Sequence, residues 1–398
     1  MEDQEITRRV KEAVEKHAKT AKMLRDDLYA HPEISGQEFE SSRKIVSLLE
    51  KAGYAAEFPF CEIPTAFRAV LETGRGPQAA VMVEYDALPG VGHGCGHNLH
   101  GSLSILAALA LMELRDLFTG TICIIGTPNE EVEGAKILMA AKGVFDGFDL
   151  AMMMHSCGGG VSQANMAALS LRGYTVEFSG RTAHTVASPW QGRSALAAAR
   201  KFIDLIDARR ECFTPDVHVN AIITDGGAAV NVIPDHAAVR IEFRTASMGS
   251  LTEADDMITK CARGAAMALD CGMEMRQSFN DFADMIRIAA LEKEVETLFK
   301  SLGVPVEDVS APMGSTDVGN VSYCCPAIQP VISITRDNFF LHTREFAGAT
   351  IKNEAFDAMK AGARVLTLLA LKVMRDGEFR KKVRDEFKAL LAAQVKSF

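Results

Sequence analysis

Apolar residues recur at helical spacing near the start of the chain and form short continuous runs further along it. Residues 6–30 carry apolar side chains three or four positions apart, which predicts an amphipathic helix that stops before His31. A second helix is expected at about 37–51, with Gly53 at its end. Three runs are apolar throughout and short enough to be buried strands, at 79–83, 122–125 and 150–154.

Helices are expected between these strands, over 99–117 and 134–142. The alternation is typical of an α/β fold with a mixed, mostly parallel sheet. The same alternation of helices and buried strands is predicted near the end of the chain, with a helix around 288–302, a buried strand at 327–334 and a helical tail from Asn353 onward. We therefore predict one discontinuous domain, formed by residues 1–169 and 282–398.

The segment 170–281 has a different pattern. Residues 171–178 alternate between apolar and polar, as in a strand with one solvated face. The elements that follow are helices at 192–208 and 251–269 and strands at 217–223, 237–243 and 273–279. This β-α-β-β-α-β order predicts a ferredoxin-like α+β domain inserted into the first.

Composition and charge narrow the range of functions. The chain is 48% hydrophobic and 24% charged, which is typical of a folded globular protein. A net charge of −9 argues against a nucleic-acid or anionic-membrane partner. We expect a cytoplasmic protein, because no apolar run is long enough to span a bilayer and the N-terminus does not resemble a signal peptide. The nine scattered cysteines are expected to be reduced.

Metal-capable side chains follow the three predicted strands of the first domain. Asp86 lies just after the first strand, Glu130 and Glu131 follow the second, and His155 directly follows the third. In an open parallel sheet the ligand site lies outside the carboxyl ends of the strands. We therefore expect these side chains to converge.

A glycine-rich loop, residues 92–98, carries Cys95 and His97 between the first two strands. Thiolate, imidazole and carboxylate groups together suit Zn²⁺ or a neighbouring first-row ion such as Mn²⁺, and argue against a Mg²⁺ or Ca²⁺ cage of oxygens. The adjacent Glu130 and Glu131 are predicted to divide into one ligand and one free base. That base would take a proton from water, whose pKa the ion lowers to roughly 7.

Each residue taken alone has a simpler interpretation. Cys95 or His97 could belong to the core, the paired glutamates could be solvated acids at a helix start, and His155 could be a buried structural histidine. Their coincidence at successive strand ends favours a site. His93 and His100 flank that site and rank below His97 as ligands.

Seven motifs resemble those of one metallopeptidase family, and they cover nearly the whole chain in order. They lie at residues 84–89, 94–98, 126–131, 180–184, 231–235, 314–317 and 341–343. The family contains aminoacylase and acetylornithine deacetylase. Within it, the motifs are most similar to the amidohydrolase subgroup of hippurate hydrolase, the indole-acetyl-amino-acid hydrolases and aminobenzoyl-glutamate hydrolase.

The resemblance implies a di-metal aminopeptidase-like catalytic domain and an inserted lid domain through which a homodimer forms. It implies two divalent ions per subunit, zinc or manganese, with cobalt and nickel as alternatives. It makes Glu130 the general base, and it also implies the ligands, which are Cys95 as the bridge with His97, Glu131, His155 and His342.

The resemblance also assigns residues outside the metal ligands. His184 matches a lid histidine that stabilises the oxyanion, in the same or the partner subunit, although it could be an ordinary loop histidine. Asn231 matches a lid asparagine near the substrate, with turn chemistry before Pro234 as the alternative. Gly314 and Ser315 are expected to contact the substrate as well.

The chain departs from the family pattern at Asn98, at Asn129, at Ser156-Cys157 and at Arg344. Every inferred ligand stays in place, so these departures bear on substrate choice. Arg344 could bind a substrate carboxylate bidentately, or it could simply be exposed.

The predicted function is metal-dependent hydrolysis of the amide bond of a small N-acyl amino acid or amino-acid conjugate with a free carboxylate. A dipeptidase acting on unusual dipeptides is the alternative within the family. A cysteine hydrolase with Cys95 as nucleophile and His97 as base is disfavoured, because two positions on one glycine-rich loop give poor geometry. A non-catalytic binding protein of the same fold is the remaining alternative, and the complete ligand set argues against it.

Overall fold

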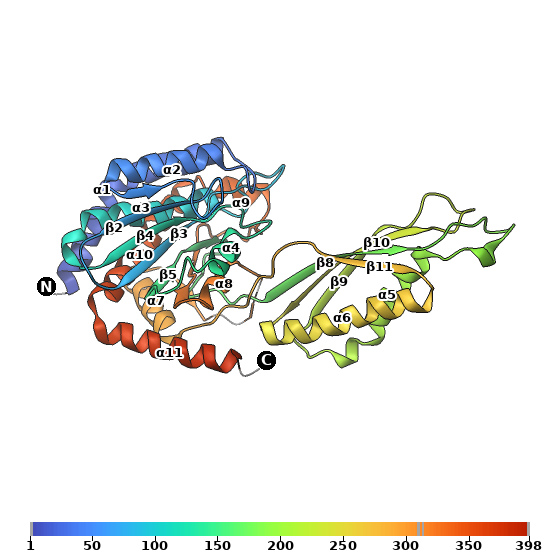
Figure 1. The fold of residues 1–398 in the computed structure, drawn as a ribbon. Coiled ribbons are helices and arrows are strands. Elements are labelled where there is room, and N and C mark those ends of the chain that lie inside the picture. Colours follow the sequence, from blue (N-terminus) through green and yellow to red (C-terminus); the bar gives the residue numbers. More distant parts are fainter. Residues whose placement is uncertain (1–2, 309–310, 313, 396–398) are drawn as a thin grey trace. The chain divides into compact units, whose positions relative to one another are not determined.

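The structure, a computed structural model, describes residues 3–308, 311–312 and 314–395. The chain divides into two compact units, one made of Met1–Ala167 and Met285–Val395 and the other of Ala168–Asp284 (Figure 1). Residues 396–398 of the predicted helical tail lie outside the described residues. Each unit is built around its own hydrophobic core.

A six-stranded sheet forms the centre of the first unit. Its order is β1 (Ala55–Glu57), β2 (Phe67–Glu72), β4 (Thr121–Gly126), β3 (Gln78–Val83), β5 (Leu150–Met152) and β13 (Ala327–Ile328). The pairs β4–β3, β3–β5 and β5–β13 are parallel, and the two pairs that involve β2 are antiparallel. The expected mixed, mostly parallel sheet is confirmed, although the sequence patterns did not predict β1 and β2.

Helices cover the sheet, and α3 (His97–Glu113) is apolar on all sides because it is surrounded by other elements. Nearly every residue of α3 is buried, since it packs against β3, α1 (Asp3–Ala30), α2 (Phe39–Ala52) and α10 (Asn353–Arg375). α3 is shorter than predicted and is followed by a separate 3₁₀ turn at Arg115–Leu117. The remaining helices of this unit are α4 (Ala135–Ala141), α7 (Ala289–Ser301), α8 (Val318–Ser322), α9 (Arg344–Ala349) and α11 (Gly377–Val395).

A second, small sheet contains residues 331–333, which were predicted to belong to a strand of the large sheet. Its order is β12 (Val306–Glu307), β7 (Ser162–Gln163), β14 (Val331–Ser333) and β6 (His155–Cys157). The strand predicted at 150–154 therefore ends at Met152. The strand predicted at 327–334 is two strands in different sheets, interrupted at Pro330, which has no N–H to continue a ladder.

The second unit has the predicted order of elements: β8 (Ser170–Ser179), α5 (Ala195–Ala208), β9 (His218–Asp225), β10 (His236–Thr245), α6 (Met248–Ala268) and β11 (Gly272–Gln277). These strands form an antiparallel sheet in the order β11-β8-β10-β9. Both helices pack against the sheet and against each other, on the same side of it in Figure 1. Across the described part of the chain, no helix combines the length and the apolar character needed to cross a membrane.

Candidate metal centre

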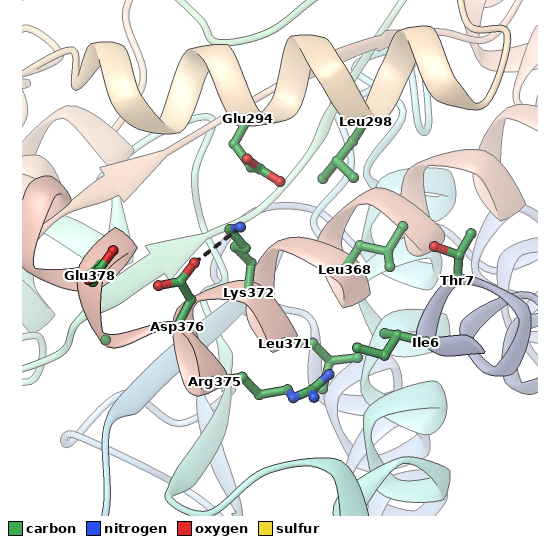
Figure 2. Close-up of a pocket in the computed structure, with 11 residues that line it drawn as sticks. Ile6, Thr7, Glu294, Leu298, Leu368, Leu371, Lys372, Arg375, Asp376 and Glu378 are labelled. Atoms are coloured by element: carbon green, nitrogen blue, oxygen red, sulfur yellow. Dashed lines mark ion pairs between the residues drawn. The ribbon is translucent and has the colours of Figure 1, made fainter. Parts of the chain in front are cut away.

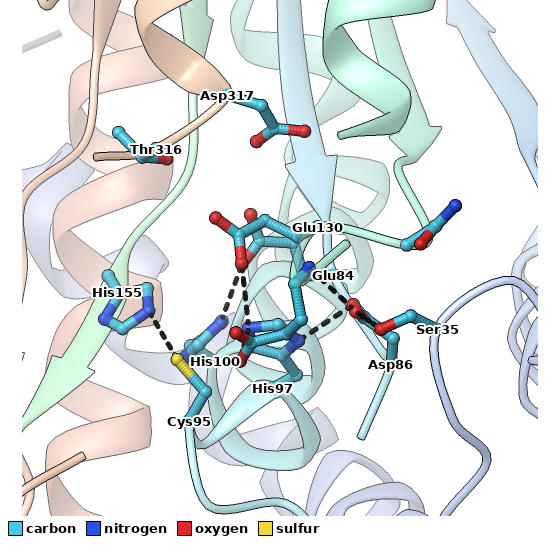
Figure 3. A network of polar contacts seen from close by, with 12 residues as sticks. Ser35, Glu84, Asp86, Cys95, His97, His100, Glu130, His155, Thr316 and Asp317 are labelled. Atoms are coloured by element: carbon cyan, nitrogen blue, oxygen red, sulfur yellow. Dashed lines mark hydrogen bonds and ion pairs between the residues drawn. The ribbon is translucent and has the colours of Figure 1, made fainter. Parts of the chain in front are cut away.

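The candidate site lies where the strand order of the large sheet reverses. From β3 the chain crosses through α3 to β4 on one side, and from β4 it returns through α4 to β5 on the other side of β3. Loops after these three parallel strands diverge at this point and leave room between them. Asp86, Glu130 and His155 come from these strand ends and His97 from the start of α3, and Figure 3 shows these four side chains around one space.

Asp86 holds His97 in a defined orientation. Its Oδ1 accepts a hydrogen bond from Nδ1 of His97 at 2.9 Å, and its Oδ2 accepts one from the hydroxyl of Ser35 at 2.8 Å. Nε2 of His97 therefore points into the site. Burial opposes protonation of His97, but the carboxylate of Asp86 raises its pKa well above the ordinary value.

Cys95 and His155 meet although they are 60 positions apart in the sequence. Sγ of Cys95 lies 3.4 Å from Nε2 of His155, whose Nδ1 donates to the carbonyl of Ser156 at 2.9 Å. The turn between Cys95 and α3 needs glycine, because Gly96 has φ 86° and a Cβ there would lie 2.2 Å from Oγ of Ser156. Burial and then the Glu131 carboxylate raise the pKa of the Cys95 thiol, so a nearby cation is needed to ionise it.

Glu131 lies between His97 and His342. Its Oε1 is 3.8 Å from Nε2 of His97, and its Oε2 is 3.5 Å from Nε2 of His342. The backbone N–H of His342 donates to the carbonyl of Gly94 at 2.8 Å, which ties its loop to the loop of Cys95. The structure thus brings all five predicted ligands together, with His342 at the exposed side of the group.

The donor set fits a transition-metal ion. One ligand atom each from Cys95, His97 and Glu131 lie within 4.8 Å of one another. Nε2 of His97 and Oε1 of Glu131 are buried and have no hydrogen-bond partner among the described residues. Buried polar atoms are normally paired, so two unpaired atoms from residues grouped with a thiol favour an ion as their partner.

Glu130 lies about as close to His97 as Glu131 does, but it groups with different side chains. The carboxylate lies 3.9 Å from Nε2 of His97 and belongs instead to a second group of acids, Glu84, Glu130 and Asp317. Burial and then the charges of Glu84 and Glu131 raise the pKa of Glu130 well above its ordinary value. A carboxyl group in these surroundings accepts and holds a proton readily.

Glu84, His100, Lys136 and Asp317 complete the site. From the sequence, His100 was ranked below His97 as a ligand, and the other three were given no functional role. Nζ of Lys136 is 2.5 Å from Oε1 of Glu84 and 2.6 Å from Oδ1 of Asp317, and Nε2 of His100 is 3.0 Å from Oε2 of Glu84. All four side chains are buried. Glu84 lies in a motif at a strand end, the only sequence signal that could have found it.

The predicted lid residues are close to each other within the second unit. His184 forms an isolated antiparallel bridge with Val232, and the carbonyl of Asn231 accepts a hydrogen bond from the N–H of Thr185 at 3.2 Å. Nδ1 of His184 accepts the N–H groups of two following residues, so its ring hydrogen is on Nε2. Trp190 follows in the same loop region and is 72% exposed.

The other residues implied by the resemblance lie in the first unit. Gly314 and Ser315 lie in the half-buried segment before α8 and are separated from Asp317 by Thr316. Arg344 is exposed and donates to the carbonyl of Gly90 at 2.9 Å, so its guanidinium already has a protein partner.

A separate cavity of about 680 Å³ lies among α1, α7, α10 and α11 (Figure 2). Its floor is apolar, and Lys372 and Asp376 form an ion pair of 3.1 Å at its edge. It is lined by none of the predicted site residues and by no histidine or cysteine. The chemistry therefore belongs to the strand-end site.

Comparisons with known proteins place the chain in a family. The family model described as peptidase family M20/M25/M40 matches residues 80–372, which include all five predicted ligands and Glu130. The chain belongs to this family. Its M20 relatives include the Xaa-Arg dipeptidase of Homo sapiens, 31% identical over 96% of this chain and 91% of that protein.

A further relative and a solved structure extend these comparisons. One component of the p-aminobenzoyl-glutamate hydrolase of Escherichia coli is 32% identical over 69% of this chain and 60% of its own length. The crystal structure of the aminobenzoyl-glutamate utilization protein of Klebsiella pneumoniae has the same fold, with a TM-score of 0.74, 21% identity and coverage of 92% of this chain and 99% of that one.

Proposed function

We propose that this M20 protein hydrolyses the amide bond of a small N-acyl amino acid or amino-acid conjugate in a metal-dependent reaction. Hydrolysis of a C–N amide bond is the chemistry of its family. The observation that carries the proposal is the separation of two adjacent acids. Glu131 groups with Cys95 and His97, whereas Glu130 stands outside that group and is available for proton transfer.

Two divalent ions, zinc or manganese, are part of this proposal, with cobalt and nickel as alternatives. The mixture of thiol, imidazole and carboxylate donors supports them. When bound, such ions polarise a carbonyl oxygen and lower the pKa of water. The residues assigned to hold them are Cys95, His97, Glu131, His155 and His342.

Glu130 moves the proton in this scheme. Its carboxylate accepts a proton from the attacking water, and the water oxygen forms the new bond to the carbonyl carbon. The carbon–nitrogen bond then breaks while Glu130 returns the proton to the leaving amine. His184 is assigned to stabilise the oxyanion through its Nε2–H, and Asn231, Gly314 and Ser315 to bind the substrate.

Dipeptide hydrolysis is the second candidate. The similarity to the Xaa-Arg dipeptidase extends over 96% of this chain, whereas the similarity to the aminobenzoyl-glutamate hydrolase covers 69%. The first relative favours a basic amino acid as the leaving group and the second favours glutamate. Both reactions break an amide bond next to a free carboxylate.

A substrate panel with metal analysis tests the proposal. Purified protein is assayed on N-acetyl amino acids, indole-acetyl conjugates, aminobenzoyl-glutamate and dipeptides ending in arginine, before and after chelation and with added Zn²⁺, Mn²⁺ or Co²⁺. We expect about two ions per chain and turnover that chelation abolishes and metal restores. Turnover that survives complete metal removal would instead support Cys95 as a nucleophile.

A homodimer through the second unit and a cytoplasmic location are also proposed. β9 is an edge strand of its sheet, and it carries Ile222 and Ile223, which are 61% and 40% exposed. An apolar edge strand is a template for pairing with another chain. The nine cysteines, all within the described residues, are free, as expected in a reducing compartment.

A further inference from the structure

A lysine is buried among acids beside the proposed general base. Glu84, Lys136 and Asp317 are each 1% exposed or less. The ammonium group of Lys136 contacts one oxygen of each acid, at 2.5 Å from Glu84 and 2.6 Å from Asp317. Burial opposes the charge on Lys136, but the two carboxylates raise its pKa above the ordinary value and keep it a cation.

The acids around this cation could otherwise hold a metal ion. Glu84, Glu130 and Asp317 each offer an oxygen within 4.8 Å of the other two. A group of carboxylate oxygens with no thiol or imidazole suits hard ions such as Mg²⁺. An ion held there would engage the oxygens of Glu130 and prevent them from accepting a proton.

Lys136 holds two of the three acids and leaves the third unengaged. The second oxygen of Asp317 accepts the backbone N–H of Lys136 at 3.1 Å, and the second oxygen of Glu84 is held by His100 at 3.0 Å. The contact of Glu130 is longer, because its Oε2 lies 3.9 Å from Nε2 of His97.

We infer that Lys136 is a positioning residue: its buried ammonium group acts as a fixed internal cation that excludes divalent ions from the Glu84–Glu130–Asp317 group and so keeps Glu130 free as the base. The inference rests on the proposed function for the role of Glu130. The exclusion of a metal ion by Lys136 is independent of the substrate and can be measured directly.

The test compares Lys136→Met with Lys142→Met. Methionine keeps most of the length of the side chain and removes the charge, while Lys142 is an exposed lysine at the C-terminal end of the same helix, 45% exposed and paired with Glu62. Both variants and the wild type are loaded with Zn²⁺ or Mn²⁺ and then titrated with Mg²⁺. Calorimetry and elemental analysis measure how much Mg²⁺ binds.

We expect Lys136→Met to bind one additional Mg²⁺ per chain, and its kcat to fall at least 100-fold with little change in KM and to fall further as Mg²⁺ is added. The wild type and Lys142→Met should show neither effect. A purely structural role for Lys136 would lower stability without creating a Mg²⁺ site. An unchanged Mg²⁺ count in folded Lys136→Met overturns the inference.

Folding of the variant can itself be used as a measurement. If Lys136→Met is recovered unfolded, we expect Mg²⁺ during refolding to restore folded protein, because the ion takes the place of the ammonium group; no effect of Mg²⁺ overturns the inference. Failure of the proposed function is a different result, namely a wild type with no turnover on the panel, and it leaves the Mg²⁺ count of Lys136→Met unaffected.

Discussion

Two adjacent glutamates at one strand end have different surroundings. Glu131 lies between two imidazoles, at 3.8 Å from His97 and 3.5 Å from His342, whereas Glu130 faces other acids. Burial and then the charges of Glu84 and Glu131 raise the pKa of Glu130 well above its ordinary value. From this difference in surroundings we propose Glu130 as the base and Glu131 as a ligand.

Replacing each glutamate in turn tests that separation. Glu130→Gln should keep the wild-type metal content and lose about 10²- to 10⁴-fold in kcat, because general-base catalysis is removed while the ligands stay. Glu131→Gln, the matched variant, should lose metal as well. Elemental analysis and steady-state kinetics on both proteins distinguish the two residues. Equal metal loss in both variants would contradict a free Glu130.

Replacing Asp86 should lower the affinity for a metal ion, although Asp86 is not one of the proposed ligands. Asp86→Asn removes the carboxylate that accepts Nδ1–H of His97 at 2.9 Å, so His97 loses its fixed orientation. The affinity for Zn²⁺ should fall about 10- to 100-fold. Competition with a chromophoric chelator measures it. Ser35→Ala, which removes a donor to the other oxygen, should have a smaller effect; the reverse order would argue against this role.

At the scale of elements, the approach of α3 to β3 positions three residues of the site. Gly101 allows it, since a Cβ at that position would lie 2.1 Å from the carbonyl oxygen of Glu84. Helix and strand end therefore touch backbone to backbone beneath the site. The start of α3 carries His97, and the residues after β3 carry Glu84 and Asp86.

Gly101→Ala should therefore weaken both the fold and the site. Overpacking against a backbone atom costs about 1–3 kcal/mol, and the displaced strand end should lower metal affinity as well. Gly264→Ala, inside α6, is the control, because the nearest atom to its Cβ would be 3.8 Å away. That change should stabilise its helix by about 0.5–1 kcal/mol. Urea unfolding measures the free energy of unfolding of both variants. A Gly101→Ala variant as stable as the wild type would contradict the close contact.

The sequence predicted the main elements because their apolar patterns are long and regular. It did not predict β1 and β2, or the change of sheet between Met152 and His155, because an apolar run shows burial and not which strand it pairs with. Lys136 was missed for a related reason. A single lysine in a short helix is normally solvated, and only tertiary structure shows two acids around it.

At the scale of the whole molecule, buried histidines couple stability to pH. Burial lowers the pKa of His93 to about 3 and that of His100 to about 4, from an ordinary value of 6.5. Below pH 6.5 the unfolded chain therefore binds protons that the folded chain does not. Stability contributed by these groups is present above pH 6.5 and is lost as the pH falls toward 4.

His93→Leu isolates one of these contributions in metal-free protein. Between pH 6 and pH 4 the free energy of unfolding of the wild type should fall more steeply than that of His93→Leu, by up to about 1.4 kcal/mol per pH unit. Urea unfolding in the presence of a chelator measures both slopes. Parallel pH profiles would show that His93 titrates normally in the folded state.

If the proposed dimer forms through β9, a single substitution at an exposed position of that strand should change the oligomeric state. Ile222→Lys places a charge on the edge strand β9, where Ile222 is 61% exposed, and should convert a dimer into a monomer. Light scattering after size-exclusion chromatography measures the mass. Met267→Lys, at another exposed apolar position of the same unit, is the control and should leave the mass unchanged. A dimer that survives Ile222→Lys would exclude β9 as its contact.

Trp190 is the single tryptophan of the chain, and it lies 72% exposed in the loop region that follows His184. An indole in water fluoresces at longer wavelength than one covered by protein. With excitation at a wavelength that tyrosine does not absorb, the emission of the unlabelled protein therefore reports on this loop region. A blue shift on addition of a substrate or on self-association would record the covering of the loop in real time.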